Sequence, residues 1–178
     1  MTLHLPSHIV QRIRLIKDKY GTPFVVRLYQ HEEKDYPALK EMYNGFEPKE
    51  WSQGIPPRVD ERREEWVRYV ADEGVNLLAL LEERVVGHAA LFEMEPGKGC
   101  EYLVFVHQEY QDRGIGTALT QLMCGLAREV GLNQIWLTVE TRNFKAIHVY
   151  EKVGFCFVGP RDIECVMRLS LCEDDEGA

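Results

Sequence analysis

The sequence has no excess of basic residues. Its 21 lysines and arginines are outnumbered by 29 aspartates and glutamates, which gives a formal net charge of −8 at pH 7. Domains that bind nucleic acid normally carry a basic surplus, so this balance argues against a general nucleic-acid binder, and no nucleic-acid partner is expected. A negative field concentrates positive ligands. The charge is therefore compatible with a cationic substrate as well as with solubility alone.

Long hydrophobic runs and paired cysteines are missing too. No apolar stretch approaches the roughly 20 residues that a membrane span needs, and residues 1–6 lack the basic start and long apolar stretch of a secretory signal. The five cysteines are scattered, odd in number and without metal-ligand spacing. We therefore expect a soluble, cytoplasmic protein with reduced cysteines, no membrane contact and no metal.

Apolar periodicity divides the chain of 178 residues, of which 45 % are hydrophobic, into helices and strands. Residues 76–82 and 85–93 flank a short turn and predict a hairpin. Residues 101–107 are almost continuously apolar, which indicates a central strand covered on both faces. The strand–helix–strand crossover over residues 101–138 implies a parallel pair within a mixed sheet. Helices are predicted near residues 7–16, 35–43, 60–70, 114–131 and 143–152, and further strands at residues 24–30, 134–138, 155–158 and 164–169.

The two chain ends are expected to lie outside the main domain. Ile9, Ile13 and Ile16 recur at helical spacing after Ser7, so residues 1–21 are predicted to form an N-terminal amphipathic helix. Its apolar stripe either packs on the chain's own domain or docks on a partner, such as a second subunit in a homodimer. The main domain is expected over residues 22–172, and the acidic tail over residues 173–178 is expected to be disordered.

An anion site is predicted after the central strand, where Gln111-x-x-Gly114-x-Gly116 leads into a strongly amphipathic helix. The first turn of a helix has unpaired N–H groups and a positive dipole end, which together suit a phosphate. Glycines let the backbone approach a ligand closely, and Arg113 adds a positive charge. Taken alone, the pattern is equally a tight turn. It is not a Walker loop, since no Gly-Lys-Ser/Thr follows, and Leu119 replaces the third glycine of the dinucleotide-binding pattern.

Two motifs in order resemble those of the GNAT superfamily of N-acetyltransferases. Residues 111–116 match its Gln/Arg-x-x-Gly-x-Gly/Ala signature, and residues 106–110 resemble the usual lead-in Val-x-Pro-x-Tyr, with Gln108 in place of the proline. Residues 143–155 resemble its Asn-x-x-Ala-x-x-x-Tyr-x-x-x-Gly-Phe block, one helix and one strand further on. The resemblance extends over residues 24–169 and identifies residues 22–172 as a GNAT acetyltransferase domain.

The resemblance implies an α/β fold of the GNAT acyl-CoA N-acyltransferase type. Its sheet is mixed and mostly antiparallel, with helices on both faces and one splayed parallel pair, here residues 101–107 and 134–138, the first ending in a bulge. Acetyl-CoA is the implied co-substrate: backbone amides of the 111–117 segment hold its pyrophosphate, the central strand pairs with its pantetheine arm, and Asn143 binds near the thioester or caps its helix. The implied cofactor-binding residues are Val104, Phe105, Val106, Gln111, Asp112, Arg113, Gly114, Ile115, Gly116, Thr117, Asn143, Ala146 and Tyr150.

The resemblance also implies catalytic roles. Tyr150 protonates the departing thiolate, for which a phenol with a pKa of about 10 is suited; the alternative is a core aromatic. The backbone N–H of Val106, at the bulge, would stabilise the oxyanion of a tetrahedral intermediate. Glu101 is the leading general base if its strand register points it into the site. The alternatives are a water molecule or Glu140, and more weakly His88 or His107.

The implied function is transfer of an acetyl group from acetyl-CoA to a primary amine, of a small molecule or of a protein. Residues 36–63 are expected to shape the acceptor site, where Tyr43, Phe46 and Trp51 either wall a pocket or form local core. A protein that senses acetyl-CoA without turning it over is the alternative function, against which the intact Tyr150 motif argues.

Overall fold

The computed structural model describes residues 5–6, 9, 12–30, 32–47, 56–94 and 99–171. Ser7, Trp51 and the acidic tail, each part of an expectation above, lie outside these residues. Within the described ranges the chain forms eight strands in one sheet, in the order β1-β2-β3-β4-β5-β6-β8-β7. The strands are β1 (Ile13–Lys17), β2 (Pro23–Leu28), β3 (Val75–Leu81), β4 (Arg84–Glu93), β5 (Cys100–Val106), β6 (Gln134–Glu140), β7 (Cys156–Val158) and β8 (Glu164–Ser170).

Neighbouring strands are antiparallel except for β5 and β6, which are parallel. This arrangement confirms the mixed, mostly antiparallel sheet that the sequence predicts. The described helices are α2 (Glu32–Gly45), α3 (Asp60–Glu73), α4 (Ile115–Glu129), α5 (Phe144–Val153) and the short 3₁₀ helix η1 (Gln108–Tyr110). None of the described helices is both long enough and apolar enough to cross a membrane.

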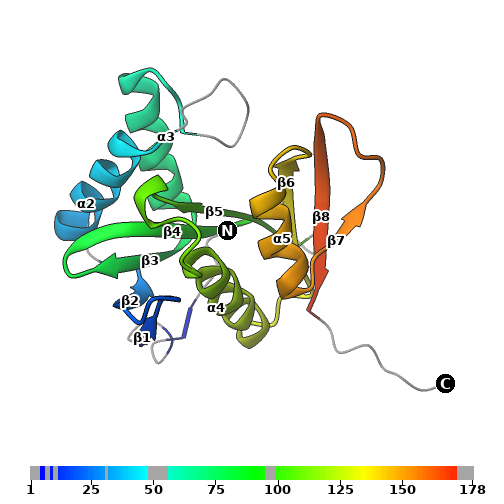
Figure 1. Ribbon diagram of the computed structural model, residues 1–178, viewed down its shortest axis with the longest axis horizontal. Helices are drawn as coiled ribbons and strands as arrows, with labels where there is room; N and C mark the ends of the chain where they lie inside the picture. Colours follow the sequence, from blue (N-terminus) through cyan, green and yellow to red (C-terminus); the bar gives the residue numbers. More distant parts are fainter. Residues whose placement is uncertain are drawn as a thin grey trace.

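Helices cover the two faces of the sheet (Figure 1). The apolar residues on the two faces form two separate clusters. The amphipathic face of α4 packs with alternate residues of the central strands, such as Ala79 and Tyr102, in the larger cluster. The intervening residues, such as Leu78, pack with α2 and α3 in a second cluster. This alternation is what a strand buried on both faces requires. The position of each residue along β5 therefore determines the face of the sheet to which its side chain points.

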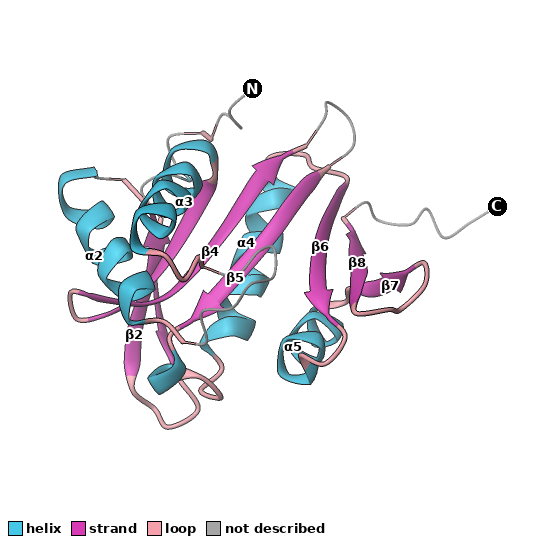
Figure 2. Cartoon of the chain, turned by 90° about the horizontal axis from the view of Figure 1, so that it is seen from above, coloured by secondary structure: helices cyan, strands magenta, loops and turns pink. Residues whose placement is uncertain are grey.

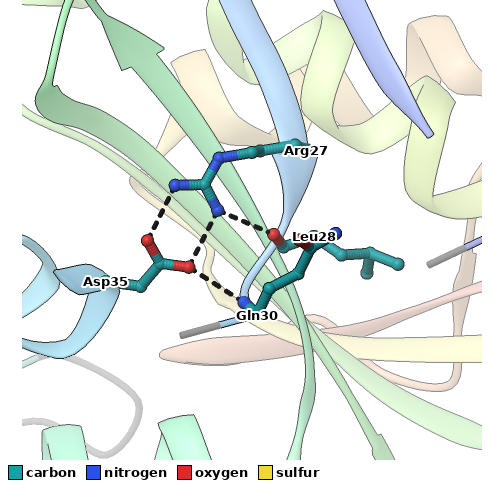
Figure 3. A network of polar contacts seen from close by, with 4 residues as sticks. All are labelled: Arg27, Leu28, Gln30 and Asp35. Carbon is teal, nitrogen blue, oxygen red and sulfur yellow. Dashed lines mark hydrogen bonds and ion pairs between the residues drawn. The ribbon is translucent and has the colours of Figure 1, made fainter. Parts of the chain in front are cut away.

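A buried ion pair fixes the start of α2 against β2 (Figure 3). Two nitrogens of the Arg27 guanidinium donate to the carboxylate of Asp35 at 2.8 and 2.7 Å, and the backbone N–H of Gln30 donates to the same carboxylate at 2.9 Å. Asp35 is 3 % exposed, so its charge is compensated by a fork-shaped pair of bonds and a backbone donor. The network joins the strand, the connecting loop and the helix.

The predicted N-terminal helix is wrong for residues 13–17. They form β1, which pairs with β2 from Ile13 opposite Arg27 to Lys17 opposite Pro23. The spacing of Ile13 and Ile16 fits a helix, but the same residues also satisfy a short strand once a neighbouring strand supplies hydrogen bonds. Ile9 is 2 % exposed within the larger core cluster, so this part of the apolar stripe packs on the chain's own domain.

Candidate active site

A slot opens in the sheet where β5 and β6 separate. Strand β5 pairs with β4 over its whole length, from Cys100 to Val106. Its pairing with β6 is limited to Cys100 with Ile135 and Glu101 with Trp136. Beyond these two pairs the strands diverge toward the ends from which α4 and α5 start, which Figure 2 shows as a V between β5 and β6. The closed end of the V therefore lies at Glu101 and its open end lies beside α4 and α5.

The backbone of β5 directs unpaired groups into this slot. Backbone hydrogen bonds join Met94 to Gly99 and His107 to Val86, at the two ends of the β4–β5 ladder. Because hydrogen-bonded and non-hydrogen-bonded pairs alternate along an antiparallel ladder, Leu103 and Phe105 bond to β4, and the N–H and C=O groups of Val104 and Val106 point the other way. In agreement with this, the side chain of Gln111 donates to the carbonyl of Val106 at 3.0 Å.

Two details of β5 differ from the expectation. Phe105 directs its backbone to β4, and its side chain packs among Tyr43, Phe46 and Trp66, so only its neighbours present backbone groups to the slot. The bulge predicted at the end of β5 is absent from its described ladder with β4, which keeps one register from Cys100 to Val106. The irregularity lies instead between β3 and β4, where the register shifts at Ala79 and Leu80.

The segment between β5 and α4 brings the helix N-terminus to the open end of the slot. Gly114 precedes α4 and has a φ of 88°, and a Cβ atom at this position would meet nothing within 4 Å. Asp112 also has a positive φ, of 57°. A Cβ on Gly116 would lie 3.6 Å from Val106, so the first turn of α4 touches the end of β5. Gly87 on β4 allows this approach, since a Cβ there would lie 3.0 Å from Leu119.

Arg113 faces away from this helix N-terminus. Its guanidinium forms an ion pair with Asp18, which is 8 % exposed, and lies over the rings of Tyr20 and Tyr110. The charge that the sequence assigns to a bound phosphate is therefore already paired with a carboxylate in the β1–β2 turn. Arg113 ties that turn to the loop rather than pointing into the slot.

A different cation lies at the open end. The ammonium of Lys145, in the first turn of α5, is 2.6 Å from the Asp112 carboxylate. The hydrogen bond from Lys145 is the main cause that lowers the pKa of Asp112. The pair links the loop before α4 to α5 across the mouth of the V. Lys145 could not be recognised from the sequence, because only the fold brings α5 beside that loop.

Helix α5 begins and ends as its motif predicts. The Asn143 side chain caps it by accepting from the N–H of Ala146 at 3.2 Å, and Gly154 ends it with φ of 107°. Tyr150 is 7 % exposed and lies edge-on to Tyr102, with ring centroids 6.5 Å apart. Burial raises its pKa. Its hydroxyl has no hydrogen bond to another described residue and is not among the fully buried polar atoms without a partner, so it reaches accessible space.

The two candidate bases lie on one face of the sheet but at different ends of β5 and β6. Cys100 and Tyr102 are in the core beneath α4, so Glu101 points to the opposite face, the side of α2 and α3, where it is exposed. Glu140 lies four residues beyond Trp136 on β6, about 13 Å along the strand. Glu101 is therefore beside the closed end of the slot, and Glu140 is near its open end.

The two candidate histidines are held in other surroundings. His88 is fully buried and bonds to Tyr43 at 2.6 Å and to Asn76 at 2.8 Å. The Asn76 amide nitrogen donates to backbone carbonyls, so its oxygen accepts from His88, and His88 in turn accepts from Tyr43. Burial lowers the pKa of His88 to about 3. Tyr43 and Phe46 are 0 % and 6 % exposed, which makes them core rather than pocket wall.

His107 and Gln108 join the end of β5 to the end of α2. The Gln108 side chain donates to the carbonyl of Gly45 at 2.8 Å and accepts from the N–H of Glu47 at 3.0 Å. A Cβ on Gly45 would lie 3.2 Å from the His107 ring. Where the GNAT lead-in usually has proline, this chain thus has a side chain that holds the end of β5 to the end of α2.

Comparison with known proteins gives the class to which this arrangement belongs. A sequence model described as the acetyltransferase (GNAT) family matches residues 26–155. The chain therefore belongs to the GNAT family of acetyltransferases. Members of the family use acetyl-CoA, and one of the similar solved structures, a putative acetyltransferase (yncA) from Salmonella typhimurium, contains it; its TM-score is 0.65 at 22% identity, over 85% of this chain and 96% of that one.

Individual relatives match more narrowly. Streptothricin acetyltransferase from Streptomyces lavendulae is 40% identical over 50 residues, 28% of this chain and 26% of the relative, so the match spans about a quarter of that protein. The L-methionine sulfoximine/L-methionine sulfone acetyltransferase of Pseudomonas aeruginosa is 25% identical over 68% of this chain and 74% of its own length. The GNAT domain of S. lividans PAT has the same fold, with a TM-score of 0.79 at 17% identity over 94% and 99% of the two chains.

Proposed function

We propose that this protein transfers an acetyl group from acetyl-CoA to the primary amine of a small molecule by direct attack of the amine on the thioester. The observation that carries the proposal is the set of backbone N–H groups without a β-ladder or helix partner at Val104, at Val106 and at the N-terminus of α4. The curated relatives that share parts of the sequence are named as acetyltransferases of different small molecules, which supports a small-molecule acceptor.

The chain's own groups suit the parts of acetyl-CoA in order. The free N–H groups at residues 114–117 and the dipole of α4 are suited to a pyrophosphate. Val104 and Val106 would hydrogen-bond an extended amide-bearing arm as an added strand would. Asn143 would contribute its remaining amide donors beside the arm while capping α5. The role of Arg113 is limited to its backbone N–H, since its side chain is paired with Asp18.

Catalysis is assigned to groups near the closed end of the V. The amine must lose a proton to become a nucleophile. Glu101, on the exposed face beside that end, would remove this proton directly or through a water molecule. The amine attacks the thioester carbonyl and forms the new N–C bond, which leaves the negative charge on the carbonyl oxygen of a tetrahedral intermediate. When the intermediate collapses, the C–S bond breaks and the Tyr150 hydroxyl donates its proton to the departing sulfur, where a thiol has a pKa of about 8.5. Burial raises the pKa of Tyr150 and so keeps the phenol protonated until that step.

The position of Val104 suits the backbone N–H that stabilises the oxyanion better than the position of Val106 does. Val106 touches the first turn of α4 and so lies at the pyrophosphate end. Val104 is two residues, about 7 Å, further toward the closed end, on the side of Tyr102 against which Tyr150 packs. Its N–H would donate a hydrogen bond to the carbonyl oxygen, on which negative charge develops.

The proposal is tested by replacing Tyr150→Phe and measuring binding and turnover separately. We expect calorimetry to give an unchanged acetyl-CoA affinity, and release of free thiol in the presence of a panel of amines to fall about 100-fold or more. Tyr20→Phe, on the exposed side of the loop, is the matched control and should leave both unchanged. Failure of the unaltered protein to bind acetyl-CoA would refute the proposal, and binding without turnover of any amine would favour a sensor instead.

A further inference from the structure

One face of the sheet stays open on the side of β6 and β8. In β8 the residues that point toward the α4–α5 side, such as Met167, are buried, and the intervening residues, such as Arg168, are exposed. Among the described residues, helices α2 and α3 cover the same face over β2, β3, β4 and β5 but not beyond them, as their core cluster and the Arg27–Asp35 pair show. The open face therefore begins where the covered one stops, at the slot between β5 and β6.

The strand registers set a row of side chains across this boundary. Phe92 on β4 is opposite Glu101 on β5, Glu101 is paired with Trp136 on β6, and Trp136 is opposite Arg168 on β8. Directly opposite residues point to the same face of a sheet, and Glu101 is on the face away from α4. At the covered end, Phe92 is stacked on Tyr69 of α3, with ring centroids 5.9 Å apart.

The row carries two opposite charges that do not neutralise each other. Among the described residues, Glu101 and Arg168 make no ion pair with one another or with any third residue. The Arg168 guanidinium lies over the Trp136 ring, 5.4 Å from its centroid, and so leans from β8 toward β5. Neighbouring strands are about 4.8 Å apart. The Arg168 guanidinium, lying over β6, is therefore about one strand spacing from β5, the strand that carries Glu101. Trp136, on β6, stands between the two charged residues in the row.

We propose that this row binds an acceptor that carries both an amine and a carboxylate, that is, a free amino acid. The inference rests on the proposed acetyl transfer and names its substrate class. The amine approaches Glu101 at the closed end of the slot, where the thioester would lie, and the carboxylate is received by Arg168. The acceptor's carbon atoms lie on Trp136, and the paired rings of Phe92 and Tyr69 limit its length on the other side. Arg168 is then a specificity-determining residue.

Arg168 is the residue to test, because an amino acid carries the carboxylate that Arg168 would bind and the matching carboxamide does not. We expect the unaltered enzyme to have a kcat/KM for amino acids about ten- to hundredfold above that for the matching carboxamides, as for a charge-assisted hydrogen bond. Arg168→Gln should bring the ratio close to one while kcat/KM for the carboxamides stays within about twofold. Arg14→Gln, an exposed arginine in β1, should leave the ratio unchanged. Calorimetry of the CoA-loaded enzyme with amino acid and carboxamide should show the same loss in affinity.

Three results would overturn the inference. One is an equal rate with amino acids and carboxamides in the unaltered enzyme. Another is an equal loss with both after Arg168→Gln, which would mean that the guanidinium only covers Trp136. The third is intact acetyl-CoA binding with no acetylation of any amino acid. Loss of acetyl-CoA binding itself would instead refute the proposed acetyl transfer, and with it this inference.

Discussion

Among the described residues, the half of the sheet from β2 to β5 is covered by helices on both faces, whereas the half from β6 to β7 is covered by α5 on one face only. In the first half, several buried charges and polar side chains are paired with one another, as with Arg27 and Asp35 or His88 and Tyr43. At the border with the second half, the described residues offer no β-ladder partner to the slot-facing N–H groups of β5, no hydrogen bond to the Tyr150 hydroxyl, and no ion pair to Glu101 or Arg168. A half with many internal pairs thus adjoins a border whose groups are available to ligands.

The largest effect is expected at the closed end of the V. Glu101→Gln removes the proposed proton acceptor and should lower kcat/KM by about 100-fold or more, with the acetyl-CoA affinity unchanged. Glu140→Gln, the same substitution at the open end, should change kcat/KM by less than about threefold. Steady-state kinetics of the two variants decide between the bases. A larger loss in Glu140→Gln would move the chemistry to the other end of the slot.

A pair of proline substitutions tests the two edges of β5 directly. Val104→Pro removes an N–H that points into the slot and should lower thiol release by about 100-fold or more, while the folded state persists because the β4 ladder does not use that group. Leu103→Pro removes a ladder donor and should destabilise the protein by about 3 kcal/mol or more. Urea unfolding and turnover are measured for both. Equal destabilisation by the two would contradict the assignment of the edges.

The covered half should set the response to acid. His88 has a pKa of about 3 in the folded protein, against about 6.5 when unfolded, so the unfolded state takes up the proton first as the pH falls. Its contribution is fully present above the unfolded value and is lost toward pH 3. At pH 5 the loss is about 2 kcal/mol.

The free energy of unfolding, from urea titrations at pH 7 and pH 5, checks this expectation. His88→Gln should flatten the pH profile at the cost of stability at pH 7. A profile that does not change between pH 7 and pH 5 in the unaltered protein would show that His88 is not held neutral by burial.

The smallest effect is expected at the mouth of the slot. Lys145 and Asp112 are both exposed, with side-chain exposures of 71% and 59%, and such pairs contribute little to stability. Lys145→Gln should therefore leave the melting temperature unchanged and weaken acetyl-CoA binding a few-fold, more at low salt than at high salt. Lys34→Gln in α2, away from the slot, is the control. Unchanged affinity at all salt concentrations would remove Lys145 from the cofactor site.

Much of this organisation could be predicted from the sequence, because local patterns carry it. The periodicity of α4, the Asn143 cap and the Gly154 end of α5 lie within single elements, and the continuous apolar run of β5 indicates its central place. What could not be predicted depends on partners distant in sequence. Residues 13–17 satisfy either a helix or a strand until β2 supplies its hydrogen bonds.

The type of a residue predicted the wrong partner where its side chain binds a residue that is distant in the sequence. Arg113 beside a phosphate-binding pattern predicts a phosphate ligand, but Asp18, 95 positions earlier, takes up its charge. The register that turns Glu101 toward the open face and aligns it with Trp136 and Arg168 depends on three strands. No single stretch of the sequence contains that information.

We propose that the free edge of β5 receives the cofactor, and residue-resolved amide hydrogen exchange with and without acetyl-CoA is the test of this role. Acetyl-CoA should slow exchange of the Val104 and Val106 amides, which face the slot. The amides of Leu103 and Phe105, which bond to β4, should already be slow and remain unchanged. If saturating acetyl-CoA leaves exchange at Val104 and Val106 unaffected, the cofactor does not bind along this edge of β5.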